Sequence, residues 1–194
     1  MRASSASTDL VDRLAAARIG ATFNQYAGSE LRQSRLREYL ERRADAPILL
    51  VGEAAGYRGA RVSGLPFTSE RQLTGSGPAE TTATIVHHTL AELGLEEDVL
   101  LWNAVPTHPG TESSNRRPTR REVEAGRRFL EELARGRRVV AVGRVAAAAT
   151  GAPYVRHPSH GGAADFRIGL AEAAVRPRRP RRVSDRRGCL AGAR

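Results

Sequence analysis

Residues that could do acid–base or hydrogen-bonding chemistry follow three apolar runs of this sequence. Glu53 comes directly after "PILLVG", Asn103 follows "DVLLW", and His157 follows "PYVR". A carboxylate can position a water molecule or stabilise a cation, and an imidazole can donate or accept a proton. Asparagine offers an acceptor and donors in one plane, which matches the carbonyl and N–H edge of a pyrimidine. Each residue also has a structural explanation, because asparagine often caps turns and a lone histidine is more often structural than catalytic.

A long loop, "GEAAGYRGARVSGLPFTSE", follows the first of these apolar runs. It carries Tyr57, Arg58 and Arg61, and we expect it to contain no helix before Glu70. Phe67 lies in its "GLPF" segment, where an aromatic ring either covers the core or stacks on a planar ligand. The chain has no lysine, so any phosphate contact has to come from arginine, a hydroxyl or a backbone N–H.

Apolar runs that alternate with amphipathic segments indicate the elements that must position these residues. Strands buried on both faces read as apolar runs, and we expect four, at 47–52, 98–105, 137–143 and 153–159. Helices are predicted at 8–18, 30–44, 81–94, 119–136, 144–150 and 164–175. Ser7 or Thr8 is expected to cap the first helix, and a capping box from Thr119 to Glu122 to open the fourth. The alternation predicts an α/β fold with a mainly parallel four-stranded sheet and helices on both faces.

This topology would bring the three polar residues together. In open parallel sheets, ligands bind outside the carboxyl ends of the strands, and Glu53, Asn103 and His157 lie at or next to three such ends. We therefore expect them to form one site although they lie far apart in the sequence. The loop after the last strand, "RHPSHGG", adds polar groups, and its glycines permit a close backbone approach.

Charge is unevenly distributed along the chain. The 31 basic and 21 acidic residues give a net charge of +10, and much of the excess lies in the segment 176–194. We expect a domain over residues 1–175 and a disordered arginine- and proline-rich tail over residues 176–194. The tail would either add salt-dependent attraction to nucleic acid or have no dedicated role. The single cysteine, Cys189, excludes an internal disulfide and any zinc or iron–sulfur site that needs several thiolates.

Membrane insertion and secretion are not expected. The sequence has no apolar stretch of about 18 residues, and its first residues lack the apolar core of a signal peptide. We expect a cytoplasmic protein that has no contact with a membrane.

Four short motifs, "GEAAG", "GLPF", "WNAVP" and "HPS", occur in this order between Ile48 and Leu170. Together they resemble the uracil-DNA glycosylase superfamily. The first motif is similar to the "GEAPG" of a branch that carries an iron–sulfur cluster, but this chain lacks the cysteine ligands and looks like a cluster-free relative. The resemblance implies a three-layer α/β/α fold and flipping of a uracil base out of DNA.

The resemblance also implies roles for individual residues. Phe67 would stack on the flipped uracil, Asn103 would read its polar edge, and His157 would donate a hydrogen bond to its O2 carbonyl. Glu53 would position the attacking water or stabilise the sugar cation. Gly52 and Tyr57 would complete the uracil-binding site. The residues that would contact DNA are Arg58, Arg61, Arg156, Ser159, His160 and Gly161.

The chain departs from the branch whose first motif is "GQDPYH". That branch has an acid where this chain has Ala54, and a tyrosine that excludes the thymine methyl where this chain has Gly56. Exclusion of thymine is therefore open, with Tyr57 or Arg58 as possible substitutes.

The predicted activity is that of a monofunctional uracil-DNA glycosylase, a monomer without metal, iron–sulfur cluster or other cofactor. The absence of lysine removes the usual Schiff-base nucleophile of a lyase. Two alternatives remain open. A catalytically weak module of the same fold would bind uracil or abasic DNA without releasing a base. A nucleoside hydrolase would cleave free deoxyuridine and ignore DNA.

Overall fold

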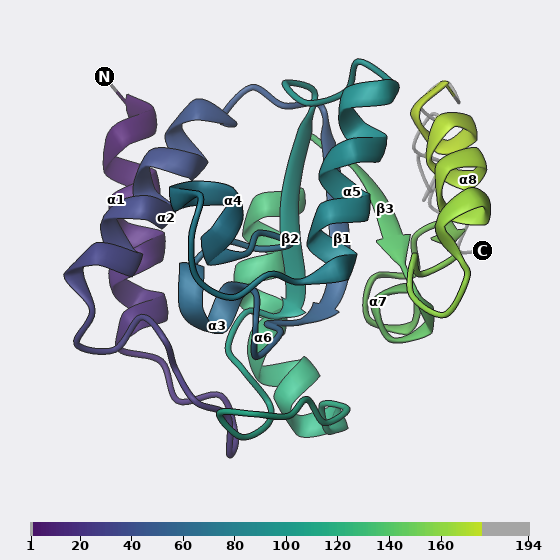
Figure 1. Ribbon diagram of the computed structural model, residues 1–194. Coiled ribbons are helices and arrows are strands. Elements are labelled where there is room, and N and C mark those ends of the chain that lie inside the picture. Colours follow the sequence, from purple (N-terminus) through teal and green to yellow (C-terminus); the bar gives the residue numbers. More distant parts are fainter. Residues whose placement is uncertain (1, 176–194) are drawn as a thin grey trace, which may run out of the picture.

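Four parallel strands form one sheet at the centre of the molecule (Figure 1). The computed structural model describes residues 2–175, so the predicted tail with Cys189 lies outside the described residues. The strands are β1 (Ile48–Ala54), β2 (Val99–Val105), β3 (Arg138–Val142) and β4 (Tyr154–Val155), in the order β2-β1-β3-β4. All four predicted strands are present, and every neighbouring pair is parallel.

The fourth strand is much shorter than predicted. It ends at Val155, whereas the sequence suggested a strand as far as Ser159. Pro158 has no N–H to donate to a neighbouring strand, and the His157 ring accepts from the backbone N–H of Ser159. The chain therefore turns away from the sheet and forms a loop at its carboxyl edge.

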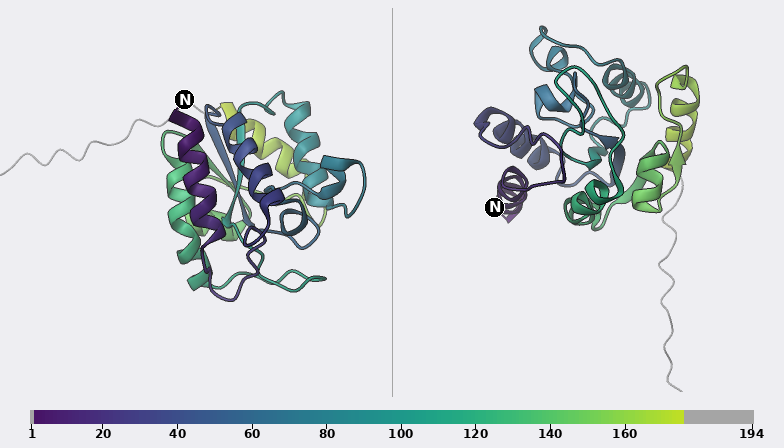
Figure 2. Two further views of the ribbon diagram at one scale, coloured as in Figure 1. Left: turned by 90° about the vertical axis from the view of Figure 1, so that its left-hand side faces the viewer. Right: turned by 90° about the horizontal axis from the view of Figure 1, so that it is seen from below.

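Helices cover both faces of the sheet, which gives a three-layer α/β/α fold (Figures 1 and 2). Alternate residues of β1 point to opposite faces, as they must in a strand. Ile48 and Leu50 pack with α5 (Thr81–Glu92) and α8 (Ala163–Val175). Leu49 and Val51 face the core that is shared by α1 (Arg2–Ala15), α2 (Glu30–Arg42), α6 (Arg120–Ala134) and α7 (Arg144–Thr150).

The observed helix starts can be compared with the caps that the sequence predicts. Thr119 and Glu122 form the predicted capping box of α6, because each side chain accepts a hydrogen bond from the other residue's backbone N–H. The predicted start of α1 is wrong, since this helix begins at Arg2 and neither Ser7 nor Thr8 caps it. The segment before Thr8 contains serine and alanine but no glycine or proline to stop a helix.

The loop after β1 contains two short helices, α3 (Ala60–Ser63) and α4 (Glu70–Thr74). The expectation of no helix before Glu70 is therefore wrong. Gly59 precedes α3, and Gly64 ends it in the left-handed conformation that favours glycine. The turn from Gly64 to Ser69 then presents the "LPF" segment to the edge of the sheet.

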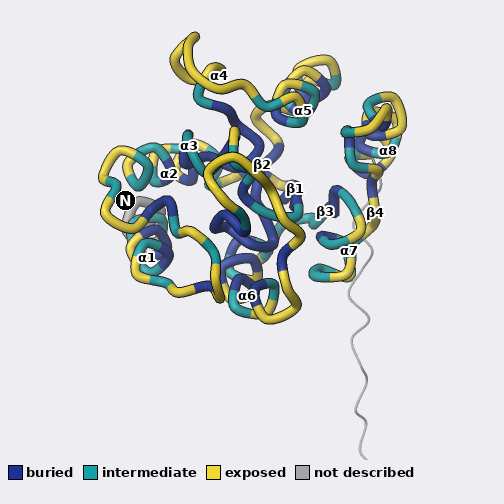
Figure 3. Tube along the Cα trace, turned by 60° about the horizontal axis from the view of Figure 1, so that its bottom comes forward, coloured by how far each residue is buried: buried dark blue, intermediate teal, exposed yellow. Residues whose placement is uncertain are grey.

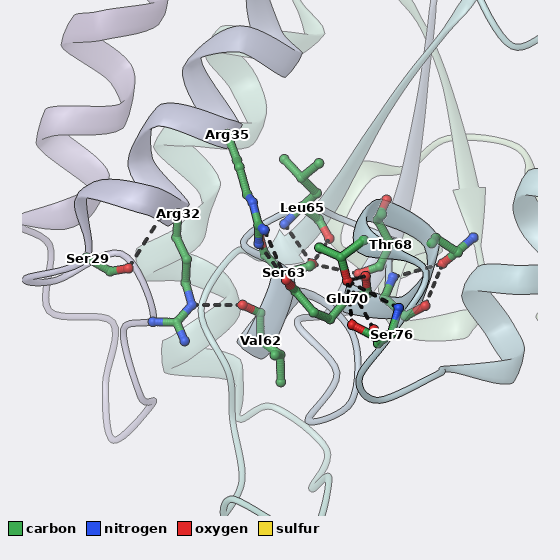
Figure 4. A network of polar contacts seen from close by, with 12 residues as sticks. Ser29, Arg32, Arg35, Val62, Ser63, Leu65, Thr68, Glu70 and Ser76 are labelled. Carbon is green, nitrogen blue, oxygen red and sulfur yellow. Dashed lines mark hydrogen bonds and ion pairs between the residues drawn. The ribbon is translucent and has the colours of Figure 1, made fainter.

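Two arginines of α2 hold this loop in place (Figure 4). Arg32 donates from Nε to the Val62 carbonyl at 2.9 Å. Arg35 forms a two-pronged ion pair with Glu70, at 2.8 and 2.9 Å, and also donates to the Ser63 carbonyl at 3.2 Å. Planar bidentate pairs of this kind fix orientation as well as distance. The loop is thus anchored on α2 at both of its short helices.

The strands lie in the buried interior, whereas residues 111–117 and 160–161 of the loops beyond their carboxyl ends are exposed (Figure 3). None of the helices described between residues 2 and 175 combines the length and the apolar character that crossing a membrane requires.

Candidate active site

A cleft of about 220 Å³ opens at the carboxyl edge of the sheet. Glu53, Phe67, Asn103 and His157 all line it. The structure therefore brings together the four side chains on which the sequence analysis placed the chemistry. They come from β1, the loop after β1, β2 and the loop after β4.

Gly52 lets Phe67 and Asn103 meet. Gly52 and Asn103 are register partners on β1 and β2. A Cβ atom on Gly52 would lie 2.8 Å from Asn103 Oδ1 and would overlap the Phe67 ring. Any larger residue here would push the ring or the amide out of place. Gly52 therefore leaves the room that both of these cleft side chains occupy.

The Asn103 amide is buried and has no hydrogen-bond partner in the described part of the chain. Only 4% of the residue is exposed, and its side chain makes no hydrogen bond to any residue in the part of the chain that the structure describes. It does not cap a local turn, which was its structural explanation. A buried amide without a partner is costly, so this side chain is well placed to bind a polar ligand in the cleft.

The surroundings of His157 determine which ring nitrogen carries the proton. Nδ1 lies 2.8 Å from Ser159 Oγ and 3.2 Å from the Ser159 backbone nitrogen. A backbone N–H can only donate, so Nδ1 accepts and the neutral ring carries its proton on Nε2. Burial lowers the pKa of His157, and the nearby His160 and Arg156 lower it further. The ring therefore offers a neutral N–H donor at the cleft.

Glu53 is half-buried near the carboxyl end of β1. Burial raises its pKa, while the positive charge of Arg117 opposes this shift. It has no hydrogen-bond or ion-pair partner among residues 2–175. Perturbed carboxyls in clefts are common at functional sites.

Phe67 adopts a strained backbone conformation. Its φ is 51°, in the left-handed region that residues with a side chain rarely adopt. Ser63 Oγ donates to the Thr68 carbonyl at 2.6 Å, and Thr68 Oγ1 lies 3.1 Å from His87 Nε2. Because Thr68 Oγ1 donates to the Pro66 carbonyl, it accepts from His87. These bonds fix the turn that holds the buried Phe67 ring against the cleft.

The predicted DNA-contacting residues lie around the cleft rather than in it. Arg58 is exposed and stacks over Tyr57 at 5.3 Å. Arg61 is paired with Glu112 at 2.7 Å and lies 4.9 Å above the Phe23 ring, so its contacts are within the protein.

In the loop after β4, Arg156 and His160 are exposed, as is Gly161. His160 has a left-handed φ of 53°, and Arg156 lies 3.5 Å from Asp165. Ser159 holds the His157 ring instead of facing solvent freely. The DNA contacts of these residues remain predictions.

His108 is a positioning residue that the sequence analysis missed. It is fully buried, and its two ring nitrogens each lie 2.7 Å from a carbonyl oxygen, those of Ala55 and Thr111. It thereby ties the loop after β1 to the loop after β2. Its position soon after the end of β2 was the only signal available in the sequence.

Glu80, Asn115 and Arg116 also line the cleft and were not expected there. Asn115 Oδ1 accepts from the Tyr57 backbone N–H at 2.9 Å, which links two walls of the cleft. Glu80 precedes α5, far from any strand end in the sequence. The rule that places sites at strand ends could not find it. In residues 2–175, no group of three acidic, histidine or cysteine side chains is arranged to hold a metal ion.

Comparisons with known proteins identify the fold and the family. The profile of the uracil DNA glycosylase superfamily matches residues 41–181. A search of curated proteins gives no match. The crystal structure of wild-type Pedobacter heparinus SMUG2 is similar, with a TM-score of 0.63 at 15% sequence identity, covering 87% of this chain and 96% of that one. At this identity the structural likeness supports the fold. The sequence match covers most of the chain, and the protein therefore belongs to the uracil DNA glycosylase superfamily.

Proposed function

We propose that the protein is a monofunctional uracil-DNA glycosylase, which hydrolyses the N-glycosidic bond of deoxyuridine in DNA. One observation carries the proposal. A buried amide without a partner, an aromatic ring and a neutral imidazole N–H line a single cleft. A flipped pyrimidine needs a ring to stack on, a partner for its carbonyl and N–H edge, and a donor for the oxygen on which charge develops.

Phe67 and Asn103 would hold the base. The Phe67 ring would stack on the uracil face, and the Asn103 amide would pair with its N3–H and O4. Gly52 allows both contacts, because a side chain at this position would displace either one. Asn103 gains its missing hydrogen bonds only when the base is bound.

His157 and Glu53 would act on the bond that breaks. The electron pair of the C1′–N1 bond moves to uracil, and the Nε2–H of His157 stabilises the negative charge at O2. Glu53, ionised, stabilises the positive charge that develops on the sugar and orients a water molecule. Water adds at C1′ and loses a proton, the uracil anion takes up a proton, and the products are free uracil and an intact abasic site. The chain offers no lysine for a subsequent lyase step.

Exposed arginines near the cleft would hold the DNA backbone. Arg117, Arg120 and Arg144 lie at the carboxyl edge of the sheet and make no ion pair with any described residue. Arginine binds phosphate in a bidentate manner. These residues extend the predicted contacts of Arg58, Arg156 and His160 along one edge of the molecule.

The direct test is release of free uracil from single- and double-stranded oligonucleotides that each contain one uracil. The wild-type protein should release uracil and leave an alkali-labile abasic site, with no strand break before alkali. Tight binding without release would support the non-catalytic module. Cleavage of free deoxyuridine with no action on DNA would support the nucleoside hydrolase.

A further inference from the structure

Glu80 is one of the cleft residues that neither the sequence motifs nor the proposed chemistry uses. It occupies the N-cap position of α5, but its side chain makes no capping hydrogen bond to that helix. The side chain turns instead into the cleft that Asn103 and Phe67 also line. It therefore belongs to the ligand site rather than to the helix.

Two glycines of the loop after β1 provide the space for the Glu80 carboxyl. A Cβ atom on Gly56 would overlap Glu80 Oε1, and a Cβ atom on Gly59 would overlap Oε2, in each case far inside van der Waals contact. No side chain other than hydrogen fits at either position while Glu80 stays where it is. The spacing of the glycines in "GYRG" is thus matched to a carboxyl from a different element.

The Glu80 carboxyl has no partner in the described part of the protein, where it makes neither a hydrogen bond nor an ion pair. Burial raises its pKa. Neither Tyr57 nor Arg58 is among the residues that line the cleft, and the Arg58 guanidinium stacks on the Tyr57 ring. Where the loop offers only glycines, Glu80 supplies the wall of the cleft.

A wall of this kind matters for choosing between bases. Uracil and thymine present the same carbonyl and N–H edge, so the Asn103 amide cannot tell them apart. They differ only by the methyl group on C5, and a methyl group is rejected either by lack of space or by contact with a polar group that it would desolvate. A carboxyl that lies against Gly56 and Gly59 takes up space in the cleft and is also polar.

We propose that Glu80 is the specificity-determining residue that excludes thymine from the cleft. The proposal rests on the proposed glycosylase function and adds to it the residue that selects the base. Glu80 acts through the shape and polarity of the wall and takes no part in breaking the bond. Its loss therefore widens the substrate range without abolishing the reaction.

The test compares Glu80→Ala with Glu80→Gln, which preserves the shape of the side chain. Substrates are duplex oligonucleotides that carry a single uracil or a single thymine opposite guanine. Glu80→Ala should raise the ratio of thymine release to uracil release by about 10- to 200-fold. This is the range of discrimination that one methyl group gives in a binding pocket. Glu80→Gln should stay within a few-fold of the wild type. Glu131→Ala, an exposed acid on α6, is the matched control.

A binding measurement separates this proposal from the proposed function. Ligand-observed NMR with free uracil and free thymine reports the selectivity of the cleft even if no bond is broken. If the wild type binds uracil but releases none, the glycosylase proposal fails and the thymine-to-uracil binding ratio of Glu80→Ala decides the role of Glu80. An unchanged ratio in Glu80→Ala, in release or in binding, overturns the proposal. Absence of both binding and release in the wild type overturns both proposals.

Discussion

At the scale of single residues, Ser159 determines which nitrogen of the His157 ring carries the proton. Its backbone N–H occupies Nδ1, so the neutral ring donates from Nε2. Burial lowers the pKa of this histidine and keeps it neutral to a lower pH than usual. A donor that is aligned before the reaction needs no reorganisation when charge develops on the leaving base.

Removing this donor should slow the reaction without preventing base binding. We expect His157→Ala to reduce single-turnover release of uracil by about 10²- to 10³-fold. His88→Ala, a change at an exposed histidine of α5 that does not line the cleft, should stay within a few-fold of the wild type. Equal rates for His157→Ala and the wild type would refute the assigned role.

The acid side of the pH profile should report Glu53. Its proposed role needs the ionised form, so activity falls as pH drops through its pKa. Burial raises that pKa, and the loss should therefore begin at a higher pH than an ordinary glutamate gives. Burial also lowers the pKa of His157, so its ring becomes charged only at a lower pH than an ordinary histidine does.

The measurement is the single-turnover rate from pH 4 to 8 for the wild type and Glu53→Gln. The variant should be slower at neutral pH. Its rate should also no longer show the fall with decreasing pH that is caused by protonation of Glu53. If the rate of Glu53→Gln falls with decreasing pH as that of the wild type does, the fall is caused by another group.

At the scale of elements, Glu122 joins three segments around the start of α6. Its carboxyl accepts from the Arg116 guanidinium at 2.8 and 2.6 Å, from the Thr119 backbone N–H at 2.8 Å and from the Ala21 N–H at 3.3 Å. The hydrogen bonds from Arg116 are the main cause that lowers the pKa of Glu122 to about 2. The same bonds hold the loop that carries Asn115 and Arg116 into the cleft.

Glu122→Gln should therefore reduce the free energy of unfolding at pH 7 by about 1.5–3 kcal/mol, as loss of a charge-assisted hydrogen bond does. The pKa is lower in the folded state, so the stabilisation is present above the ordinary carboxyl pKa and is lost as pH falls toward 2. Urea unfolding at pH 7 and pH 3 measures both effects. Glu124→Gln, an exposed residue on the same helix, should change little, and an equal loss in the two variants would contradict the account.

The loop after β1 shows what element-level sequence signals miss. The sequence contains glycines at 56 and 59, but it does not show why glycine is needed there. The carboxyl that they accommodate comes from Glu80, which precedes α5. Likewise α3 is one turn long and is held by α2 through Arg32 and Arg35. Contacts between distant segments determine this region, whereas local propensity suffices for the long helices.

At the scale of the whole molecule, the predicted alternation of strands and helices was enough to bring three of the cleft residues together. Continuous apolar runs identified β1, β2 and β3, and the rule for parallel sheets placed Glu53, Asn103 and His157 at one edge, where the structure has them. The rule concerns strand ends only. It gave no information on Glu80 and Asn115, which reach the cleft from a helix start and a loop, or on His108, which ties two of the loops together.

The unpaired arginines at the same edge predict salt-sensitive binding to DNA. We expect Arg117→Ala and Arg120→Ala each to weaken binding of uracil-containing and ordinary duplexes alike, and to reduce the slope of log Kd against log salt by about 0.9 per lost phosphate contact. The control is Arg42→Ala. Arg42 is the last residue of α2, which precedes β1 and ends near the amino edge of the sheet. Fluorescence anisotropy at several salt concentrations measures the slopes, and equal slopes in all variants would remove these arginines from the interface.

The central claim is that Phe67, Asn103 and His157 form one uracil-reading cleft. A crystal structure of the protein with uracil tests it most directly. The account predicts the base stacked on Phe67, its N3–H and O4 paired with the Asn103 amide, and its O2 within hydrogen-bond distance of His157 Nε2. Uracil bound elsewhere, or bound in this cleft with its polar edge turned away from Asn103, would contradict it.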